Sequence, residues 1–175
     1  IGVKSLFDWT PDNRNHVRFG GGYQYHIYNV NRVKEEEYKE DENTLASART
    51  TDGNMYDGHE FYLYIEDEMQ LTDWFTANAG LRYVLFGVPG KVYNTLEPRF
   101  ALKFKCSDVL AIKASYTEMT QFNHQVATSY IDLPSNTWMP VTDKIDPMKA
   151  KQVAGGLYFT LPYGLTLNVE GWWKR

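Results

Sequence analysis

The chain has 175 residues, a formal net charge of −4 and 15% aromatic residues, with 13 Tyr and 5 Trp among them. The length suits one domain of ordinary size, and the slightly acidic balance gives no basic footprint of the kind that nucleic-acid binding requires. The single cysteine, Cys106, excludes an internal disulfide framework. No apolar run approaches the length of a transmembrane helix.

The aromatic content is compatible with two classes of β-protein. In outer-membrane β-barrels, Tyr and Trp gather in girdles at both membrane interfaces, where an apolar ring with a polar tip is well placed. The same residues also suit the core of a soluble β-sandwich. Composition alone therefore leaves a membrane barrel and a soluble sandwich equally open.

The chain begins with a predicted partial strand at Ile1–Phe7, followed by a polar turn with the sequence DWTPDNRN. Residues His16–Tyr28 then alternate between two kinds of side chain, the period-two pattern of a strand with unlike faces. The triple glycine Gly20–Gly22 lacks the Lys-Ser/Thr that a phosphate-binding loop requires. It predicts a bend or bulge in a curved strand.

The next segment, Asn29–Gly58, is long, polar and charged, and includes KEEEYKEDE at Lys34–Glu42. Carboxylates at this density could bind a divalent cation, but the spacing of a calcium-binding loop is missing. We therefore predict a solvated loop here.

Residues Glu60–Phe86 give the clearest strand signal. Apolar or small residues occupy alternate positions over 61–65 and again over 75–85, and a short turn around Leu71–Trp74 separates the two runs. Each arm is about eleven residues long, whereas strands in soluble domains usually have about five or six. A strand that crosses a bilayer needs about nine to eleven. The pattern predicts a long antiparallel hairpin with one face on lipid.

The rest of the chain contains two more long strands and a last hairpin. The predicted elements are a loop at Gly87–Thr95, a strand at Leu96–Phe104, a tight turn with the sequence KCSD, a strand at Val109–Met119, a long loop at Thr120–Lys149, and a hairpin pairing Ala150–Thr160 with Leu165–Lys174 across LPYG.

The predicted connections alternate strictly between long loops and short turns. Up-and-down outer-membrane barrels have this alternation because short turns face the periplasm and long loops face the outside. Soluble sandwiches more often mix connection lengths through Greek-key crossings. The sequence therefore favours an all-β, antiparallel, up-and-down transmembrane β-barrel.

If the apolar alternates face lipid, the other face points into the barrel. The residues predicted to face the lumen are Tyr62, Tyr64, Glu66, Glu68, Arg82, Arg99, Lys103, Lys113 and Glu170. They could contact a plug, line a path for a ligand, or only pair with one another. Asp67 and Lys151 fall on the nominal lipid face, so we expect both to lie close to strand ends.

The segment DEMQLTDWFTANAGLRYVLF (67–86) resembles the recurrent strand-turn-strand of TonB-dependent outer-membrane receptors, with an acidic pair before a short turn and a Gly-Leu-Arg-Tyr element in the next strand. The segments LEPRFALKF, ASYTEMTQFNH and NTWMPVTDKIDPMKAKQVAGGLYFTL are similar to successive strands and an outer loop of that family. Their order and spacing carry the resemblance, which covers most of the chain from His59 onward.

The resemblance implies a location in the bacterial outer membrane and a role in the energised uptake of a scarce ligand. Such receptors have a 22-stranded barrel, a plug, and a box that engages TonB, whereas this sequence provides about seven complete strands and part of an eighth. We therefore expect residues 1–175 to be a single segment of the barrel, without plug or TonB box. The implied partners are membrane lipid, the TonB complex through the parent's plug and a possible surface lipoprotein, with no cofactor.

Candidate ligand contacts lie in the long loop. Asn123, His124, Tyr130 and Trp138 offer hydrogen-bonding groups and stacking faces, although Trp138 could instead only pack the loop onto the barrel rim. Neither a nucleophile elbow nor a metal-ligand spacing is present, so we predict no enzyme activity and no metal site.

Two alternatives remain open at this stage. One is a self-contained eight-stranded outer-membrane barrel with a structural or adhesion role, whose interior would be filled by side chains. The other is a soluble lipocalin-like barrel with the apolar face inside. A partial barrel predicts unpaired edges on the first and last strands, whereas a neatly closed barrel would contradict it.

Overall fold

The computed structural model describes residues 1–30, 33–38, 45–51, 54–126 and 137–175. Eight of its strands form one antiparallel sheet in the order β1-β2-β5-β6-β7-β8-β11-β12. Their bounds are Gly2–Trp9 (β1), Asn15–Val30 (β2), Asn54–Gln70 (β5), Phe75–Val88 (β6), Lys91–Lys105 (β7), Leu110–Gln121 (β8), Met148–Thr160 (β11) and Thr166–Lys174 (β12).

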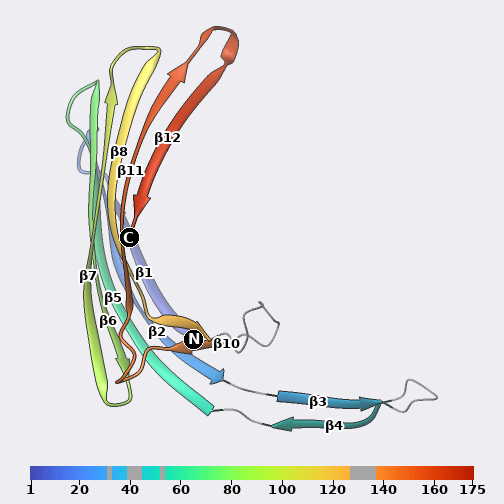
Figure 1. Cartoon of the computed structure of the whole chain (residues 1–175). Helices are drawn as coiled ribbons and strands as arrows, with labels where there is room; N and C mark the ends of the chain where they lie inside the picture. Colours follow the sequence, from blue (N-terminus) through green and yellow to red (C-terminus); the bar gives the residue numbers. More distant parts are fainter. Residues whose placement is uncertain (31–32, 39–44, 52–53, 127–136) are drawn as a thin grey trace.

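The sheet is one curved layer with a concave and a convex face (Figure 1). Short turns connect the strands at one end, and at the other end β3 (Val33–Tyr38) pairs with β4 (Leu45–Thr51) as an outward extension of β2 and β5. A small hairpin of β9 (Asn123–Val126) and β10 (Thr137–Pro140) lies on the concave side and contacts β2 and β5.

Within the described residues, the sheet does not close on itself, because β1 and β12 stand at opposite ends of the strand order. This agrees with the prediction of a partial barrel and contradicts a self-contained eight-stranded barrel. An unpaired strand edge in a membrane leaves backbone N–H and C=O groups without partners. Further strands beside β1 and β12 would satisfy those groups.

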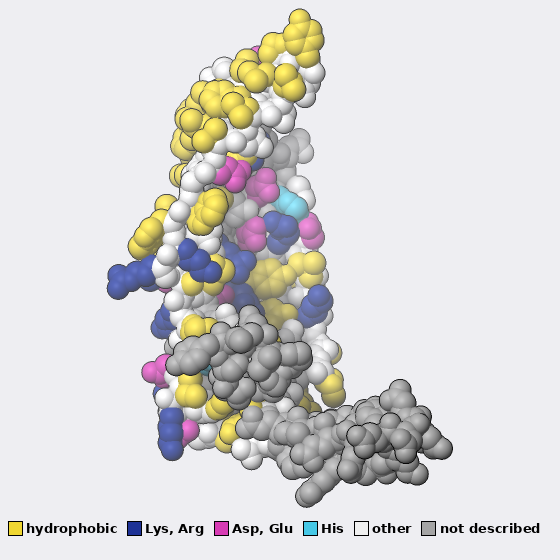
Figure 2. Space-filling view, turned by 45° about the vertical axis from the view of Figure 1, so that its right-hand side comes forward, with side chains coloured by type: hydrophobic (Ala, Val, Ile, Leu, Met, Phe, Trp, Pro, Cys, Tyr) yellow, Lys and Arg dark blue, Asp and Glu magenta, His cyan; other side chains and the backbone are white. Residues whose placement is uncertain are grey.

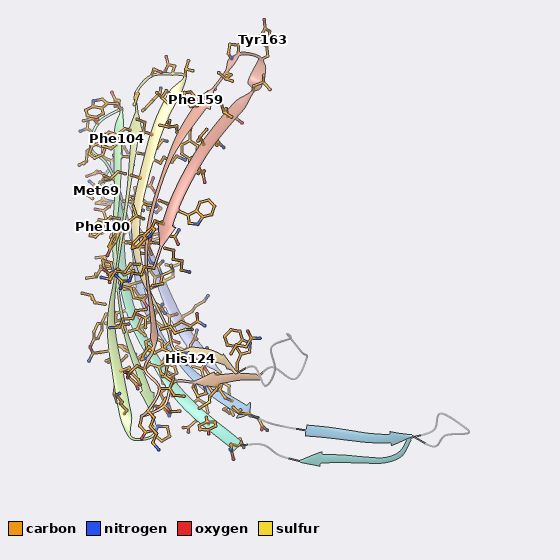
Figure 3. All side chains as sticks on the ribbon, in the orientation of Figure 1. Met69, Phe100, Phe104, His124, Phe159 and Tyr163 are labelled. Carbon is orange, nitrogen blue, oxygen red and sulfur yellow. The ribbon has the colours of Figure 1, made fainter. Side chains whose placement is uncertain are left out.

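Cross-strand register assigns the two faces. One row runs Phe7–Phe19–Ile65–Leu81–Pro98 across five strands, and the neighbouring rows in the same phase are also mostly apolar, with Ser5 and Asp67 as polar members. Met69, Phe100 and Phe104 belong to this set and point away from the β9–β10 hairpin (Figure 3). The apolar set therefore covers the convex face, so the lipocalin-like alternative, which needs it inside, is wrong.

Two of the predicted loops are largely strand. β6 continues to Val88, and β7 already begins at Lys91. The predicted loop Gly87–Thr95 is therefore reduced to the turn Pro89–Gly90. Pro fixes the first turn position and Gly90 adopts φ 86°, a conformation that glycine reaches without strain. The loop prediction overlooked how short a Pro-Gly turn can be.

The predicted solvated loop Asn29–Gly58 is also mostly paired backbone. β2 and β5 remain in register up to the pair Val30↔Asn54, and β3 contains the charged sequence VKEEEY. A charged strand is stable in water when a partner strand satisfies its backbone hydrogen bonds. The second half of the acidic run, 39–42, lies outside the described residues.

The triple glycine makes room for tyrosines and introduces no bulge, because β2 stays in register with both neighbours through residues 20–22. On the concave side, the Tyr62 and Tyr64 side chains cover Gly22 and Gly20, with their hydroxyls 2.7 Å and 3.1 Å from where each Cβ would lie. A Cβ on Gly20 would also lie 2.3 Å from the Ser5 carbonyl oxygen.

We expect Gly20→Ala to lower the free energy of unfolding by about 2 kcal/mol, a typical cost of overpacking a tight contact. Urea unfolding in lipid vesicles, followed by tryptophan fluorescence, would measure it. Gly171→Ala is the matched control, because nothing lies within 4 Å of the added Cβ. Equal midpoints for the two variants would contradict this account of β2.

Candidate binding surface on the concave face

A partly buried ion-pair network joins three strands on the concave face. Arg82 on β6 donates from Nη2 to Oε1 of Glu60 on β5 (3.0 Å) and from Nη1 to Oε2 of Glu97 on β7 (3.4 Å). Its guanidinium also lies over the Tyr62 ring, 4.7 Å from the centroid. Glu97 is only 2% exposed, and its second oxygen accepts a hydrogen bond from the Thr120 amide at 2.9 Å. A carboxylate this deeply buried needs both partners.

The network extends to β2 and to the start of the long loop. His26 Nε2 lies 3.2 Å from Oε2 of Glu60, and the Tyr28 hydroxyl donates to Oδ1 of Asn123 at 2.6 Å. Farther toward the short turns, Glu66 accepts hydrogen bonds from Arg18 (2.7 Å) and from Asn78 (2.8 Å). Figure 2, turned toward this side of the molecule, shows charged side chains along its middle part. The concave face thus holds local ion pairs that join β2 with β5 and β5 with β6 and β7.

An apolar cluster interrupts this polar face beside the loops. Val84 and Phe86 on β6 are 0% and 1% exposed although they share the face of Arg82. The Phe122 ring stacks on Phe86 with centroids 4.7 Å apart, and Val141 packs into the same cluster at 0% exposure. The two ends of the long loop therefore fold inward and dock on the sheet.

Hydrogen bonds from β7 fix the returning end of this loop, residues 140–146. The Tyr93 hydroxyl donates to the Thr142 carbonyl at 2.6 Å, and the Val141 amide donates to the Phe122 carbonyl at 2.8 Å. Lys91 Nζ lies 3.1 Å from Oδ1 of Asp146, and its ammonium holds the pKa of that carboxyl below the usual value. We call residues 120–126 and 137–147 the docked loop.

The lowered pKa of Asp146 gives the Lys91 contact a defined pH dependence. A carboxyl whose pKa is depressed by folding contributes stability above its unfolded pKa, and loses it as pH falls through the folded value. We expect carbon-13 carboxyl NMR to give a lower pKa for Asp146 in the wild type than in Lys91→Gln. Identical titration curves would show that the pair does not form in solution.

Three of the four predicted ligand residues, Asn123, His124 and Trp138, lie on the small hairpin at this end of the concave face. Asn123 is engaged by Tyr28, while His124, labelled in Figure 3, has a buried Nε2 with no hydrogen-bond partner among the described residues. Trp138, on β10, is 52% exposed. Tyr130 lies outside the described residues. Asn123 and His124 thus directly follow Phe122 of the apolar cluster, and Trp138 lies on the paired strand β10 with its side chain half exposed.

The residues predicted to face the lumen share the concave face, in the phase opposite to the apolar convex set. They are Tyr62, Tyr64, Glu66, Glu68, Arg82, Arg99, Lys103, Lys113 and Glu170. Asp67 and Lys151 lie on the convex face within three residues of the ends of β5 and β11, as expected, and Lys151 pairs with Glu118 at 2.9 Å.

Sequence reasoning missed Glu60 and Glu97, the two carboxylates that hold Arg82. Glu97 has the same phase as Arg99, so strand alternation alone could have placed it on the concave face. Its pairing with Arg82 depends on the β6–β7 register, which the Pro89–Gly90 turn sets. Because the sequence predicts a longer loop in place of this turn, it does not predict the β6–β7 register or the pairing of Glu97 with Arg82.

These features define the class of protein. Long antiparallel strands in sequential order, an apolar convex face and a polar concave face are those of the wall of a large transmembrane β-barrel. Across the ranges that the structure describes, no helix is long and apolar enough to cross a bilayer, a test that leaves strands out of account. Nor do His, Cys, Asp or Glu side chains there form a cluster that could hold a metal ion.

The particular family follows from comparison with known proteins. The family model described as "TonB dependent receptor-like, beta-barrel" matches residues 3–175, and the chain belongs to this family. Receptor barrels of this type interact with TonB and are outer-membrane proteins of Gram-negative bacteria. It is a family of receptors and transporters, not of enzymes.

Solved structures show the same fold. The FrpB iron transporter from Neisseria meningitidis, in its F3-3 and F5-1 variants, superposes with a TM-score of 0.65 at 14% and 16% sequence identity. Each match covers 99% of this chain and 27% of the transporter chain, so the sequence spans about a quarter of those structures. No curated protein matches the sequence.

Proposed function

We propose that this chain forms part of the barrel wall of a TonB-dependent receptor that takes up a scarce ligand across the outer membrane. The observation that carries the proposal is the division of one continuous sheet into an apolar convex face and a charged concave face. The convex face meets lipid, and the concave face lines the lumen. Plug and TonB contacts belong to the intact receptor, and a surface lipoprotein is a further candidate partner.

The docked loop narrows the lumen on the side of the long connections. Phe122 and Val141 hold it against β6, and Asn123, His124 and Trp138 are the residues of this loop that we assign to ligand contact. We infer no catalytic step, because uptake moves the ligand without changing its covalent structure.

The experiment is ligand uptake by cells that express the complete receptor, with and without TonB. The panel should include ferric siderophores and free iron, because the structural neighbours are described as iron transporters, together with vitamin B12 and oligosaccharides as non-iron ligands. We expect uptake of one ligand, lost without TonB. Equal uptake in both strains for every ligand would refute the proposal.

A further inference from the structure

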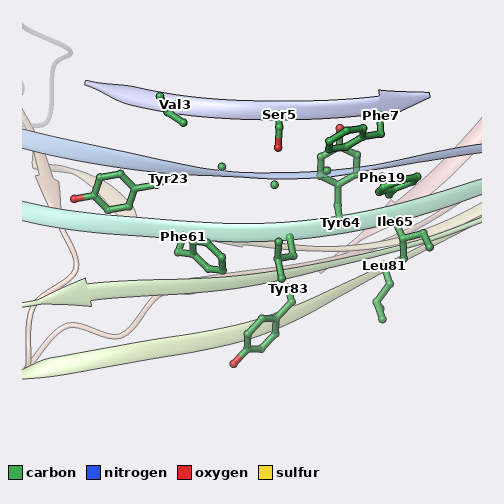
Figure 4. Close-up of a pocket in the computed structure, with 14 residues that line it drawn as sticks. Val3, Ser5, Phe7, Phe19, Tyr23, Phe61, Tyr64, Ile65, Leu81 and Tyr83 are labelled. Atoms are coloured by element: carbon green, nitrogen blue, oxygen red, sulfur yellow. The ribbon is translucent and has the colours of Figure 1, made fainter. Parts of the chain in front are cut away.

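The convex face carries a hollow of about 640 Å³ where β1, β2, β5 and β6 lie side by side (Figure 4). Cross-strand register builds it from three neighbouring rows. Phe7 and Phe19, stacked with centroids 5.2 Å apart, form one wall, and Tyr23 and Phe61 form the other. The row between them forms the floor of the hollow and consists of Ser5, Gly21 and Leu63 on β1, β2 and β5, of which Ser5 has a small side chain.

Gly21 is the second floor position and must remain glycine. It lies opposite Ser5 on β1 and Leu63 on β5. A Cβ there would meet Leu63 Cδ2 at 2.6 Å and the Tyr62 carbonyl oxygen at 2.7 Å. No side chain can fill the floor at this position, because the atoms of β5 already lie too close to Gly21. The hollow is therefore set by the packing of the strands.

The lining of the hollow is mostly apolar, and the Ser5 and Tyr83 side chains contribute two of its few hydroxyl groups. The backbone of β2 is paired on both sides through this region, and the Tyr23 hydroxyl is already 2.7 Å from His59 Nδ1. A peptide or sugar has many more polar groups than these hydroxyls can satisfy, so it would bury most of them without partners, which costs free energy. A hydrocarbon chain has no such groups. The chemistry of the lining thus selects a hydrocarbon occupant.

One end of the hollow is suited to the polar end of a lipid. Tyr23 and Tyr25 pack against His59, with ring centroids 6.0 Å and 5.0 Å from it, on the side toward the long connections. Aromatic side chains with polar tips sit at the boundary between hydrocarbon and headgroups. Phe7, at the opposite end, lies deeper in the apolar band.

We propose that this hollow is a specific binding site for one hydrocarbon chain of an outer-membrane lipid, with the lipid's polar end beside Tyr23 and His59. The site goes beyond ligand uptake and rests on the proposed function only in placing the convex face in the membrane. The hollow is continuous with the apolar convex face, so membrane lipid is the occupant that reaches it.

Native mass spectrometry of the complete receptor, extracted from outer membranes in mild detergent, tests the site. Ser5→Trp and the smaller Ser5→Leu fill the floor, while Val153→Trp adds the same bulk on the convex face of β11, 49% exposed and outside the hollow. We expect one retained lipid per receptor in the wild type and in Val153→Trp, and at least a tenfold smaller lipid-bound fraction in both Ser5 variants.

Circular dichroism and heat-modifiable gel mobility would verify that each variant is folded, and Ser5→Leu keeps the test usable if Ser5→Trp fails to fold. Equal lipid retention in Ser5→Leu and wild type would overturn the site, as would a wild-type receptor that retains no lipid, or one whose retained mass is a protein. Ligand uptake by the folded Ser5 variants is expected to equal wild type, so failure of the lipid site and failure of the receptor role are distinguishable.

Discussion

Replacing Arg82 by Met is expected to lower the free energy of unfolding by about 3 kcal/mol. The substitution removes the cation from two carboxylates, of which Glu97 is 2% exposed and Glu60 has a side chain 16% exposed. An uncompensated buried carboxylate must either remain desolvated or take up a proton, and both cost free energy. Because the Arg82 side chain is itself 29% exposed, we place the effect at the low end of the range for buried pairs.

Urea unfolding of the complete receptor in lipid vesicles would measure this effect. Arg99→Met is the matched control, since Arg99 lies on the same face and forms no ion pair within the described part of the chain, and its change should stay within about 0.5 kcal/mol. Adding Glu97→Gln to Arg82→Met should recover part of the loss, because the buried charge is then gone. Equal effects of the two Arg substitutions would contradict the proposed network.

The second large effect is expected from Phe122→Ala, which should release the docked loop. The Phe122 ring is 8% exposed and stacks on Phe86, and truncation of a buried Phe costs about 3 kcal/mol or more. A loss of about 3 kcal/mol in docking free energy corresponds to roughly a hundredfold increase in the open population. Hydrogen exchange read by mass spectrometry should show this acceleration at the amides of Val141 and Ile145, both hydrogen-bonded in the docked state.

Trp138→Ala is the control for loop docking and also tests the role of Trp138. If Trp138 contacts ligand, its removal should leave exchange at Val141 unchanged and weaken ligand binding tenfold or more, as expected for an exposed aromatic anchor. If Trp138 only packs the loop onto the barrel rim, hydrogen exchange at Val141 should accelerate in Trp138→Ala, and ligand binding should weaken only as far as the loop opens. An unchanged exchange rate in Phe122→Ala would show that the apolar cluster does not hold the loop.

Strand alternation predicted most of the sheet because its period fixes the face of each side chain. Tyr62, Arg82 and Lys103 share the concave face, as their alternation predicted they would share one face, because each strand is long and has unlike sides. The strand extension through VKEEEY was not predicted, because charged residues are rare in strands and only the partner strand β4 stabilises it.

The buried cluster could not be predicted from local pattern. Val84 and Phe86 are apolar residues on a polar face, and alternation treats them as exceptions. Their burial depends on Phe122 and Val141, which reach them from far along the chain. The burial of Glu97 also depends on a residue distant in sequence, because its carboxylate accepts a hydrogen bond from the amide of Thr120 at the end of β8. Such long-range contacts form only after register and loop path are set.

The most direct test of the account is site-directed spin labelling along β11 in the complete receptor, reconstituted in lipid vesicles on a Cys106→Ser background. Labels at Val153 and Leu157 lie on the convex face, and labels at Gln152 and Ala154 lie on the concave face. We predict that collision rates with oxygen, which concentrates in lipid, peak at 153 and 157 and fall at 152 and 154. Oxygen maxima at 152 and 154, or no alternation, would contradict the assignment of the convex face to lipid and with it the barrel-wall role.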